Sequence, residues 1–275
     1  MLGQMLDRVR QTEPLVHCIT NYVTVNDCAN ILLACGGSPI MADDQDEAAE
    51  ITSLCGGLVL NIGTLNRRTI PSMFAAGKRA NELGHPVLLD PVGAGASALR
   101  TDTARGILSQ LRCTAVRGNA SEIKTLAGEC GATRGVDADS ADALNAGTMD
   151  AAVRMAQRLS RDTGAVVIIT GATDLVADEQ RAFLIQNGHP MMSRITGSGC
   201  MLSAMMGAFL AANPEDALEA AAAAVCTMGL CGEEAAGLVE RYGGGTASLR
   251  MYLIDAVSRL NGDRLEEGAK IEAYA

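Results

Sequence analysis

Aromatic residues and positive charge are both scarce in this sequence. It has no tryptophan, aromatics make up 3% of its 275 residues, and 22 Lys and Arg stand against 32 Asp and Glu. The positive residues form no cluster. Because affinity for a nucleic-acid backbone depends on Lys and Arg, we expect no nucleic-acid partner. An anionic ligand would have to be held locally, by a few placed cations or by backbone N–H groups.

Close cysteine pairs and zinc-like histidine spacings are also missing. The nine cysteines are an odd number without a C-x-x-C pair, and Cys18, Cys28 and Cys35 lie in apolar runs. A buried free thiol behaves as a small hydrophobe, so this pattern favours a reducing cytoplasm over a disulfide framework. The three histidines are not spaced like zinc ligands, so we expect no structural metal site.

Long hydrophobic runs are absent as well. No run reaches about 18 purely apolar residues, so no membrane span is expected. The first ten residues, MLGQMLDRVR, contain Asp7 and lack a long apolar core, which predicts an amphipathic helix and not a signal peptide. We find no linker and no repeat, and therefore expect a single domain over residues 1–275.

The residues that are abundant favour an α/β protein: the chain is 48% hydrophobic and has 30 glycines. Short apolar stretches alternate with helical ones. Strands are expected at 15–20, 38–41, 58–62, 86–89, 113–117 and 165–170, with a hairpin at 173–188. Helices are expected at 28–35, 46–54, 71–83, 101–111, 119–126, 150–161, 216–236 and, last, 246–260. Residues 128–148 are expected to form a long surface connection. This alternation predicts a mostly parallel sheet with helices on both faces.

In such folds ligands bind at the carboxyl ends of the strands. Several residues stand at or just after the end of a predicted strand and should meet at one edge of the sheet. They are Asn21, Met41, Gly63, Asp90, Arg117, Thr170 and Gly197.

The stretch at 195–204, ITGSGCMLSA, predicts a glycine-rich turn that enters an apolar helix. The free N–H groups and the dipole of a helix N-terminus attract phosphates, although glycines there can also serve tight packing alone. Cys200 in the first helical turn could have a lowered pKa and act as a nucleophile. His17 is the obvious candidate partner, but nothing in the sequence brings the two together.

Two carboxylates each allow two interpretations. Glu122 follows Asn119 by three residues, which fits a capping box, but it could also hold Mg²⁺ near phosphates. Asp90 precedes Pro91 as a turn residue would, or it is a second carboxylate near the same metal. Together with a late glycine turn, the two carboxylates favour a phosphate-transfer site.

Other nucleotide and hydrolase motifs do not fit. The sequence has no G-x-x-x-x-G-K-[ST] loop and no G-x-S-x-G elbow where a hydrolase needs one. The stretch at 92–97, VGAGAS, follows a predicted strand but lacks the third glycine of a dinucleotide-binding turn.

Six stretches lie in order along nearly the whole chain and can be read together. They are HCITNYV at 17–23, SPIMA at 38–42, NIGTL at 61–65, LDPVGA at 89–94, RGNASE at 117–122 and ITGSGC at 195–200. The N-x-x-E, D-P-V-G and T-G-S-G motifs among them resemble the ribokinase-like fold of small-molecule kinases. The I-T-N and S-P-I-M stretches distinguish one family from its relatives, and the chain resembles that family, the hydroxyethylthiazole kinases.

The resemblance implies ATP-dependent phosphorylation of the hydroxyl of 5-(2-hydroxyethyl)-4-methylthiazole with Mg²⁺, a thiazole salvage step of thiamine biosynthesis. It implies a cytoplasmic homotrimer with active sites between subunits. By similarity, the residues that line the thiazole pocket are Asn21, Val23, Met41, Gly63 and Gly197. Arg117 and Thr170 would contact ATP, and Gly199 would contribute N–H groups to the anion hole. Asp90 and Glu122 would hold the magnesium ion.

Cys200 stands where most ribokinase-like enzymes carry an aspartate as general base, and where this family commonly has cysteine. A thiol is a weak base for an alcohol, so Cys200 is either the base or a group that positions the hydroxyl, and a slow enzyme is expected. Two other hypotheses stay open. One is a hydroxymethylpyrimidine kinase or a nicotinamide-nucleotide hydrate dehydratase, which would differ around Asn21 and Met41. The other is a non-catalytic binder of thiazole or nucleotide.

Overall fold

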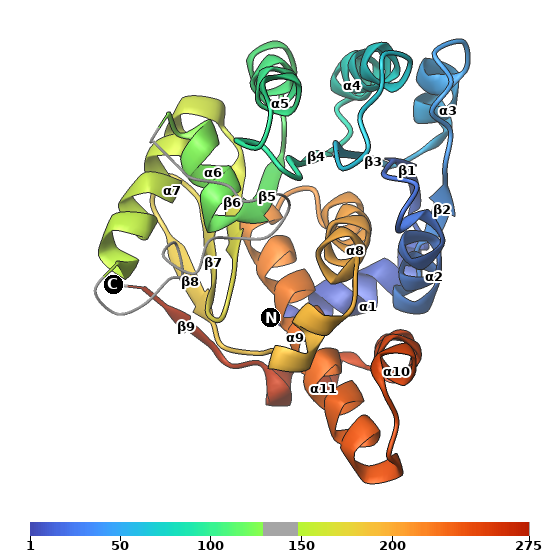
Figure 1. Cartoon of the computed structure of the whole chain (residues 1–275), viewed down its shortest axis with the longest axis vertical. Helices are drawn as coiled ribbons and strands as arrows, with labels where there is room; N and C mark the ends of the chain where they lie inside the picture. Colours follow the sequence, from blue (N-terminus) through green and yellow to red (C-terminus); the bar gives the residue numbers. More distant parts are fainter. Residues whose placement is uncertain (129–147, 275) are drawn as a thin grey trace.

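The computed structural model describes residues 1–128 and 148–274. Nearly all of the connection expected at 128–148 lies outside the described residues. A single nine-stranded sheet organises the rest, in the order β2-β1-β3-β4-β5-β6-β7-β8-β9 (Figure 1). The strands are β1 Leu15–Ile19, β2 Ser38–Ile40, β3 Gly57–Asn61, β4 Val87–Asp90, β5 Ala115–Asn119, β6 Val166–Thr170, β7 Asp174–Ala177, β8 Ala182–Ile185 and β9 Ile271–Ala273.

The sheet is mostly parallel, as the alternation predicted. All neighbours from β2 to β6 pair in parallel, and β6 to β9 pair antiparallel. The predicted hairpin is confirmed as β7 and β8. Because the carboxyl ends of β1, β3, β4, β5 and β6 lie at one edge, the polar residues that follow them are brought together there.

Helices cover both faces of the sheet (Figure 1). One face carries α1 Leu2–Thr12, α2 Val25–Cys35, α8 Ser198–Ala212, α9 Ala217–Tyr242, α10 Thr246–Arg259 and α11 Gly262–Gly268. The other carries α3 Ala48–Leu54, α4 Thr69–Leu83, α5 Ala98–Gln110, α6 Ala120–Leu126 and α7 Met149–Thr163.

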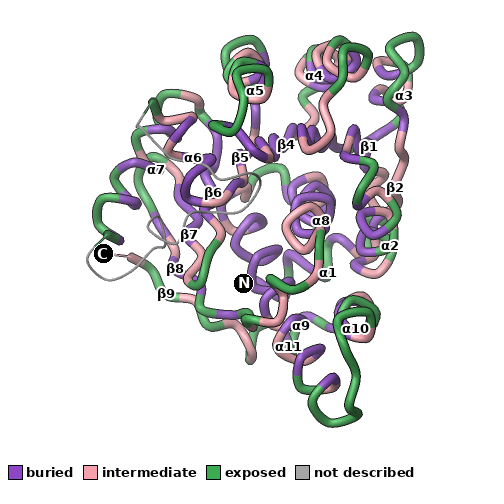
Figure 2. Tube along the Cα trace, viewed as in Figure 1, coloured by how far each residue is buried: buried purple, intermediate pink, exposed green. Residues whose placement is uncertain are grey.

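Each face has its own apolar core, and the strands contribute to both. Cys18 and Val59 point into the core under α8, while Leu58 and Leu60 point into the core under α4. Strands buried on both faces are apolar at consecutive positions, which explains why they appear in the sequence as short continuous runs. Figure 2 shows the central strands and the inner faces of the helices as buried.

Helix α8 packs on the sheet through a small residue. A Cβ added to Gly207 would lie 2.5 Å from Val59 Cγ2 and 3.0 Å from Val16 Cγ1, so α8 approaches β1 and β3 more closely than a larger residue allows. Residues 201–210 of this helix are all buried. The close packing directs the N-terminus of α8 at the carboxyl edge of the sheet.

Several expected boundaries differ from the structure. Helix α2 begins at Val25 instead of residue 28, and α9 continues to Tyr242 instead of residue 236. The helix at 246–260 is not the last element, because α11 and β9 follow it and β9 pairs with β8. A short 3-10 helix, η2 Pro190–Arg194, was also not predicted. The amphipathic helix expected at the N-terminus is confirmed as α1.

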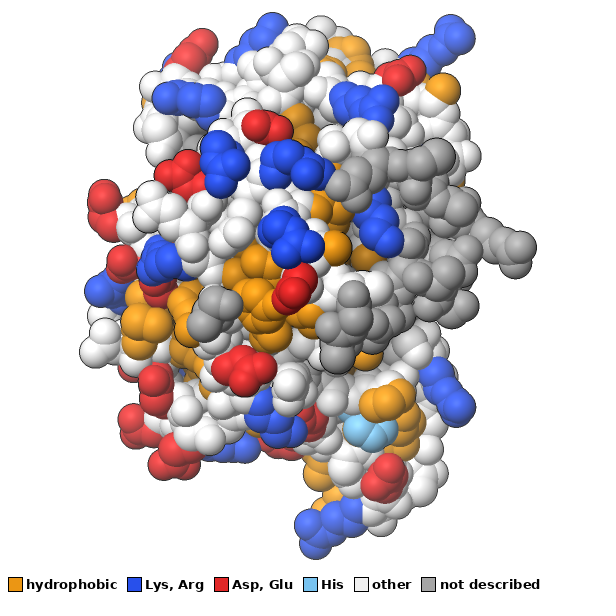
Figure 3. All heavy atoms as spheres, turned by 90° about the vertical axis from the view of Figure 1, so that its left-hand side faces the viewer, with side chains coloured by type: hydrophobic (Ala, Val, Ile, Leu, Met, Phe, Trp, Pro, Cys, Tyr) orange, Lys and Arg blue, Asp and Glu red, His pale blue; other side chains and the backbone are white. Residues whose placement is uncertain are grey.

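One described helix, α9, is long and apolar enough to cross a membrane by length and composition. Its most apolar window is 72% buried in the structure, and a core helix of a globular protein passes the same test. Figure 3 shows the face on the side of α7 and β9, where Lys and Arg side chains are interspersed with Asp and Glu around an apolar area.

Candidate active site

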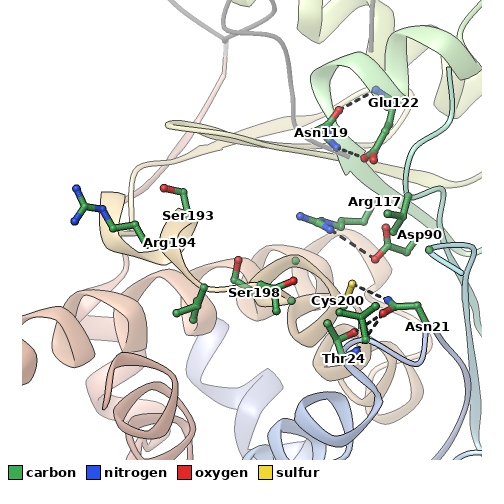
Figure 4. Close-up of a pocket in the computed structure, with 17 residues that line it drawn as sticks. Asn21, Thr24, Asp90, Arg117, Asn119, Glu122, Ser193, Arg194, Ser198 and Cys200 are labelled. Carbon is green, nitrogen blue, oxygen red and sulfur yellow. Dashed lines mark hydrogen bonds and ion pairs between the residues drawn. The ribbon is translucent and has the colours of Figure 1, made fainter. Parts of the chain in front are cut away.

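A cavity opens where the carboxyl ends of β1, β3, β4 and β5 meet the N-terminus of α8 (Figure 4). Its volume of about 510 Å³ suits a small-molecule ligand. It is lined by Asn21, Val23, Thr24, Gly63, Asp90, Val92, Arg117, Asn119, Glu122, residues 193–197, Ser198, Gly199 and Cys200.

A second cavity of the same volume shares Arg117, Ser193, Ser198 and Gly199 with the first. The two therefore meet at the first turn of α8. Met192, Leu202, Val225 and Met228 give the second cavity an apolar wall, and Thr170, Asp174, Asn187 and His189 give it polar groups.

Ten of the eleven residues predicted for the site line one of these cavities. Nine line the first, namely Asn21, Val23, Gly63, Asp90, Arg117, Glu122, Gly197, Gly199 and Cys200, and Thr170 lines the second. Met41 is not among the residues that line either cavity. It is partly buried and packs against the apolar core under α2 and α8.

The first turn of α8 forms an anion site together with one arginine. Gly197 precedes the helix at φ 86°, a left-handed conformation that favours glycine. A Cβ on Gly199 would lie 2.5 Å from Arg117 Nη1, so the guanidinium rests against the helix backbone. Arg117 Nη2 donates to Thr170 Oγ1 at 2.6 Å. A cation beside free N–H groups at a helix N-terminus attracts phosphate.

Asp90 is completely buried at the end of β4. Its Oδ2 accepts hydrogen bonds from Asn61 Nδ2 and Ser203 Oγ, both at 2.8 Å, and lies 3.6 Å from Arg117 Nη1. Burial raises the pKa of this carboxyl, and Arg117, Ser203 and Asn61 oppose that effect. Oδ1 has no hydrogen-bond partner among the described residues.

The capping interpretation of Glu122 is confirmed. Asn119 Oδ1 accepts from the Glu122 N–H at 2.9 Å, and Glu122 Oε2 accepts from the Asn119 N–H at 2.8 Å. Glu122 Oε1 accepts from the Gly93 N–H at 2.8 Å, which ties α6 to the loop after β4. Burial, and next the charge of Asp90, raise the pKa of Glu122 to about 7.

The two carboxylates also fit a divalent cation. The charge of Asp90 disfavours that of Glu122, and Asp90 Oδ1 has no hydrogen-bond partner among the described residues. Among the described residues there is no group of three or more His, Cys, Asp or Glu side chains that could hold a metal ion. A metal here would therefore take one or two carboxylates plus phosphate and water oxygens, which is the usual environment of Mg²⁺.

The surroundings of Cys200 do not lower the pKa of its thiol. Burial, and next the charge of Asp90, raise the pKa of its thiol, so the alternative of a lowered pKa at the helix N-terminus is wrong. Its Sγ accepts from Asn21 Nδ2 at 3.1 Å and from Asn61 Nδ2 at 3.3 Å. His17 is not its partner, because the imidazole is buried between Thr52 Oγ1 and the Ala42 carbonyl.

Comparisons with known proteins agree with this geometry. A sequence model of the hydroxyethylthiazole kinase family matches residues 6–263. A hydroxyethylthiazole kinase from Clostridium acetobutylicum is 56% identical over 274 residues, which cover 100% of both chains. One from Desulfovibrio desulfuricans is 51% identical over 278 aligned positions, with 98% of both chains covered. The chain belongs to the hydroxyethylthiazole kinase family.

Solved structures support the same family and its fold. The structure of a hydroxyethylthiazole kinase protein from Pyrococcus horikoshii superposes with a TM-score of 0.87 at 37% identity, covering 100% of this chain and 99% of that chain. A ribokinase-like superfamily protein from Enterococcus faecalis has a TM-score of 0.60 at 12% identity, covering 92% and 89%. This family member therefore has the ribokinase-like fold.

Three residues in or directly behind the cavities of this hydroxyethylthiazole kinase family member were not predicted as site residues. Asn61 ends β3, so the rule of strand ends could have found it. Ser203 contacts Asp90 from 113 residues away, and Asn187 comes from the loop after β8. Ser203 lies in the stretch at 195–204, three residues after Cys200, so helical spacing could have found it. Nothing in the local sequence places Asn187 near the site.

Proposed function

We propose that this protein is an ATP-dependent kinase that phosphorylates the hydroxyl of 5-(2-hydroxyethyl)-4-methylthiazole in thiazole salvage. Relatives that are named for this activity and match over the full length support the proposal. The observation that carries it is the meeting of two cavities at the N-terminus of α8, one with Cys200 and Asp90 and one with an apolar wall. A single kinase domain over residues 1–275 is part of the proposal, and the one continuous sheet supports it.

The first cavity takes the thiazole alcohol and the second takes the nucleotide. Asn21, Val23, Gly63 and Gly197 line the thiazole side, and the Cys200 thiol lies among them. The apolar wall of the second cavity suits a flat base. The shared boundary, with Arg117 and Gly199, then receives the phosphates, and Thr170 contacts ATP beside Arg117.

Asp90 and Glu122 are the side chains that would hold Mg²⁺, Asp90 through its free Oδ1. Bound there, the cation would neutralise phosphate charge. The chain itself supplies the remaining electrostatic stabilisation, from Arg117 and from the N–H groups of the first turn of α8. Phosphoryl transfer has a loose transition state, so positioning and charge stabilisation carry most of the catalysis.

Cys200 faces the position expected for the substrate hydroxyl. Its raised pKa keeps the thiol neutral at pH 7, which makes it a weak proton acceptor and favours a role in orienting the hydroxyl.

A cytoplasmic homotrimer with active sites between subunits is part of this proposal. Tyr22 and Val23 at the rim of the first cavity are 77% and 59% exposed, and such apolar groups suit cover by a neighbouring subunit. Met41, which does not line the cavities of its own chain, would then complete a site from a neighbour. The free cysteines of the described residues agree with a cytoplasmic location.

Turnover with a panel of alcohols tests the function. Purified protein with ATP and Mg²⁺ should phosphorylate the thiazole alcohol with a higher kcat/KM than hydroxymethylpyrimidine or pyridoxal. Preference for one of those two alcohols would assign the protein to another ribokinase-like activity. ATP binding without turnover of any alcohol would favour the non-catalytic binder.

A further inference from the structure

Asn61, the last residue of β3, is 2% exposed and lies between the ends of β1 and β4. Its Nδ2 donates to Asp90 Oδ2 at 2.8 Å and to Cys200 Sγ at 3.3 Å. Its Oδ1 accepts from Asn21 Nδ2 at 3.0 Å and from the Gly63 N–H at 2.9 Å. The side chain therefore uses all the hydrogen-bonding capacity of a primary amide, two donors and two acceptor lone pairs.

These partners fix the orientation of the amide. A carboxylate accepts only, so the NH₂ group must face Asp90, and the N–H groups of Asn21 and Gly63 require the oxygen on the other side. A flipped amide would place its oxygen against the buried carboxylate and leave both donors unpaired, which is costly away from water.

The two ends of the Asn61 amide bind two different parts of the site. Its donors hold the groups at the reaction centre, the Asp90 carboxylate and the Cys200 thiol. Its acceptor holds the loop that lines the predicted thiazole pocket, and a Cβ on Gly63 would lie only 2.9 Å from Asn61 Oδ1. One planar group therefore joins the reaction centre to the substrate loop, beside the direct hydrogen bond from Asn21 Nδ2 to Cys200 Sγ at 3.1 Å.

We infer that Asn61 is a positioning residue for phosphoryl transfer, whose amide holds Cys200 and Asp90 in register with the substrate loop at Asn21 and Gly63. The inference rests on the proposed kinase function. Asn61 touches neither reacting atom in this assignment, and acts through the four groups that it binds.

Asn61→Asp tests the donor side of the amide without changing its acceptor side. The aspartate keeps the shape and the acceptors for Asn21 and Gly63, but it loses both donors and places a second carboxylate beside Asp90. We expect kcat to fall about tenfold to a hundredfold, since misplacement near 1 Å costs up to about this much. The KM for the thiazole alcohol should stay within about twofold, because uniform binding is retained.

Asn61→Ser gives a second variant in case the aspartate prevents folding. Its hydroxyl is too short to reach all four partners, so both sides lose support. We expect kcat to fall and the KM for the thiazole alcohol to rise together. A serine variant with the kcat and KM of the wild type would overturn the inference.

Asn213→Asp is the matched control. Asn213 is also buried, at 1% exposure, and its Nδ2 donates to the Phe209 and Met5 carbonyls at the opposite end of α8. This variant should lower the melting temperature and leave kcat and KM unchanged. Equal losses of kcat in the Asn61 and Asn213 aspartate variants would show a general stability effect and contradict the positioning role.

The contact between Asn61 and Cys200 can also be tested without any turnover. The measurement is the rate at which iodoacetamide alkylates Cys200, followed by peptide mass mapping. In Asn61→Asp the thiol loses an N–H donor and faces a carboxylate, so its alkylation should slow several-fold. Asn213→Asp should react at the wild-type rate. If the wild type fails to phosphorylate the thiazole alcohol, the proposed function fails, while equal alkylation rates in wild type and Asn61→Asp would overturn the inference by itself.

Discussion

At the scale of single residues, burial governs the acid–base behaviour of this site. It raises the pKa of Asp90, Glu122 and Cys200 alike, and the hydrogen bonds from Asn61 and Ser203 only partly compensate at Asp90. Acidic groups that are costly to charge when alone become easier to charge when a cation enters, because the buried site then gains a counter-charge. Two predictions belong to this scale.

Replacement of Cys200 separates a positioning group from a nucleophile. Asn21 and Asn61 already direct N–H donors at Sγ, so a carboxylate in Cys200→Asp would be received by both and would be a better proton acceptor at neutral pH. We expect Cys200→Asp to keep or raise kcat, and Cys200→Ala to lower it, within the ~10²–10⁴-fold range of general-base effects. Steady-state rates and intact-mass spectra under turnover measure both.

Cys35→Ala is the control for that experiment, since Cys35 is a buried thiol of α2 that donates to the Leu32 carbonyl and does not line the cavities. Its kcat should equal that of the wild type. An inactive Cys200→Asp that still folds and binds ATP, or a mass adduct on Cys200, would contradict the mechanism.

Asp174 should make stability depend on pH. Burial raises its pKa from 3.8 to about 7, although it accepts from the Gly171 N–H at 2.8 Å and lies near Arg117. Between these two values the folded protein keeps a proton that the unfolded chain has released, so the free energy of unfolding falls as the pH rises through this window. Asp174→Asn removes this contribution.

Urea unfolding at about pH 5 and about pH 8 checks this sign. Because one pKa unit corresponds to about 1.4 kcal/mol, the wild type should lose at least about 1 kcal/mol relative to Asp174→Asn between the two pH values. A wild type that gains stability relative to the variant as the pH rises would show that the folded pKa of Asp174 is lowered.

At the scale of elements, α8 connects the sheet to the site. Its middle lies against β1 and β3 at Gly207, its first turn presents free N–H groups beside Arg117, and Ser203 on its inner face reaches Asp90. A shift of this helix would move the anion site and would also move Ser203 relative to the Asp90 carboxylate, which belongs to β4. The packing at Gly207 is therefore important for both stability and geometry.

Gly207→Val tests the close packing of α8. The added side chain would meet Val59 and Val16, and overpacking of a core costs about 1–3 kcal/mol. We expect the free energy of unfolding to fall by at least about 2 kcal/mol. Gly237→Val in α9 is the matched control, because a Cβ there meets nothing within 4 Å and the residue is exposed. Equal stabilities of the two variants would contradict the packing argument.

At the scale of the whole molecule, the site occupies one edge of a nine-stranded sheet, and its rim is open to further cover. Tyr22 and Val23 are exposed beside the first cavity, and Met41 lies outside it. This arrangement is explained most simply if a neighbouring subunit closes the thiazole side, as the trimer proposed above would.

Light scattering in solution tests the assembly. We expect a molar mass three times the 28.5 kDa of one chain. On dilution below the dissociation constant, activity per chain should fall, because each site loses the residues of its neighbour. A monomer with full activity would exclude sites shared between subunits.

The sequence alone determined the features that depend on local pattern. The alternation of strands and helices, the capping box of Asn119 and Glu122, and the edge position of Asp90 all follow from spacing within a few residues, and the structure has them. The family resemblance named eleven site residues, and ten of them line the two cavities, because strand ends of a parallel sheet meet at one edge.

Only the tertiary structure decided the features that depend on contacts distant in sequence. The pKa of Cys200 is raised because burial and the charge of Asp90 outweigh the opposing effects of Thr24, Arg117 and Asn21, a balance that local pattern does not contain. Strand β9 is three residues long and needs the edge of β8 for its hydrogen bonds. The four partners of Asn61 come from β4, α8 and two loops, and only folding brings them within reach of one amide.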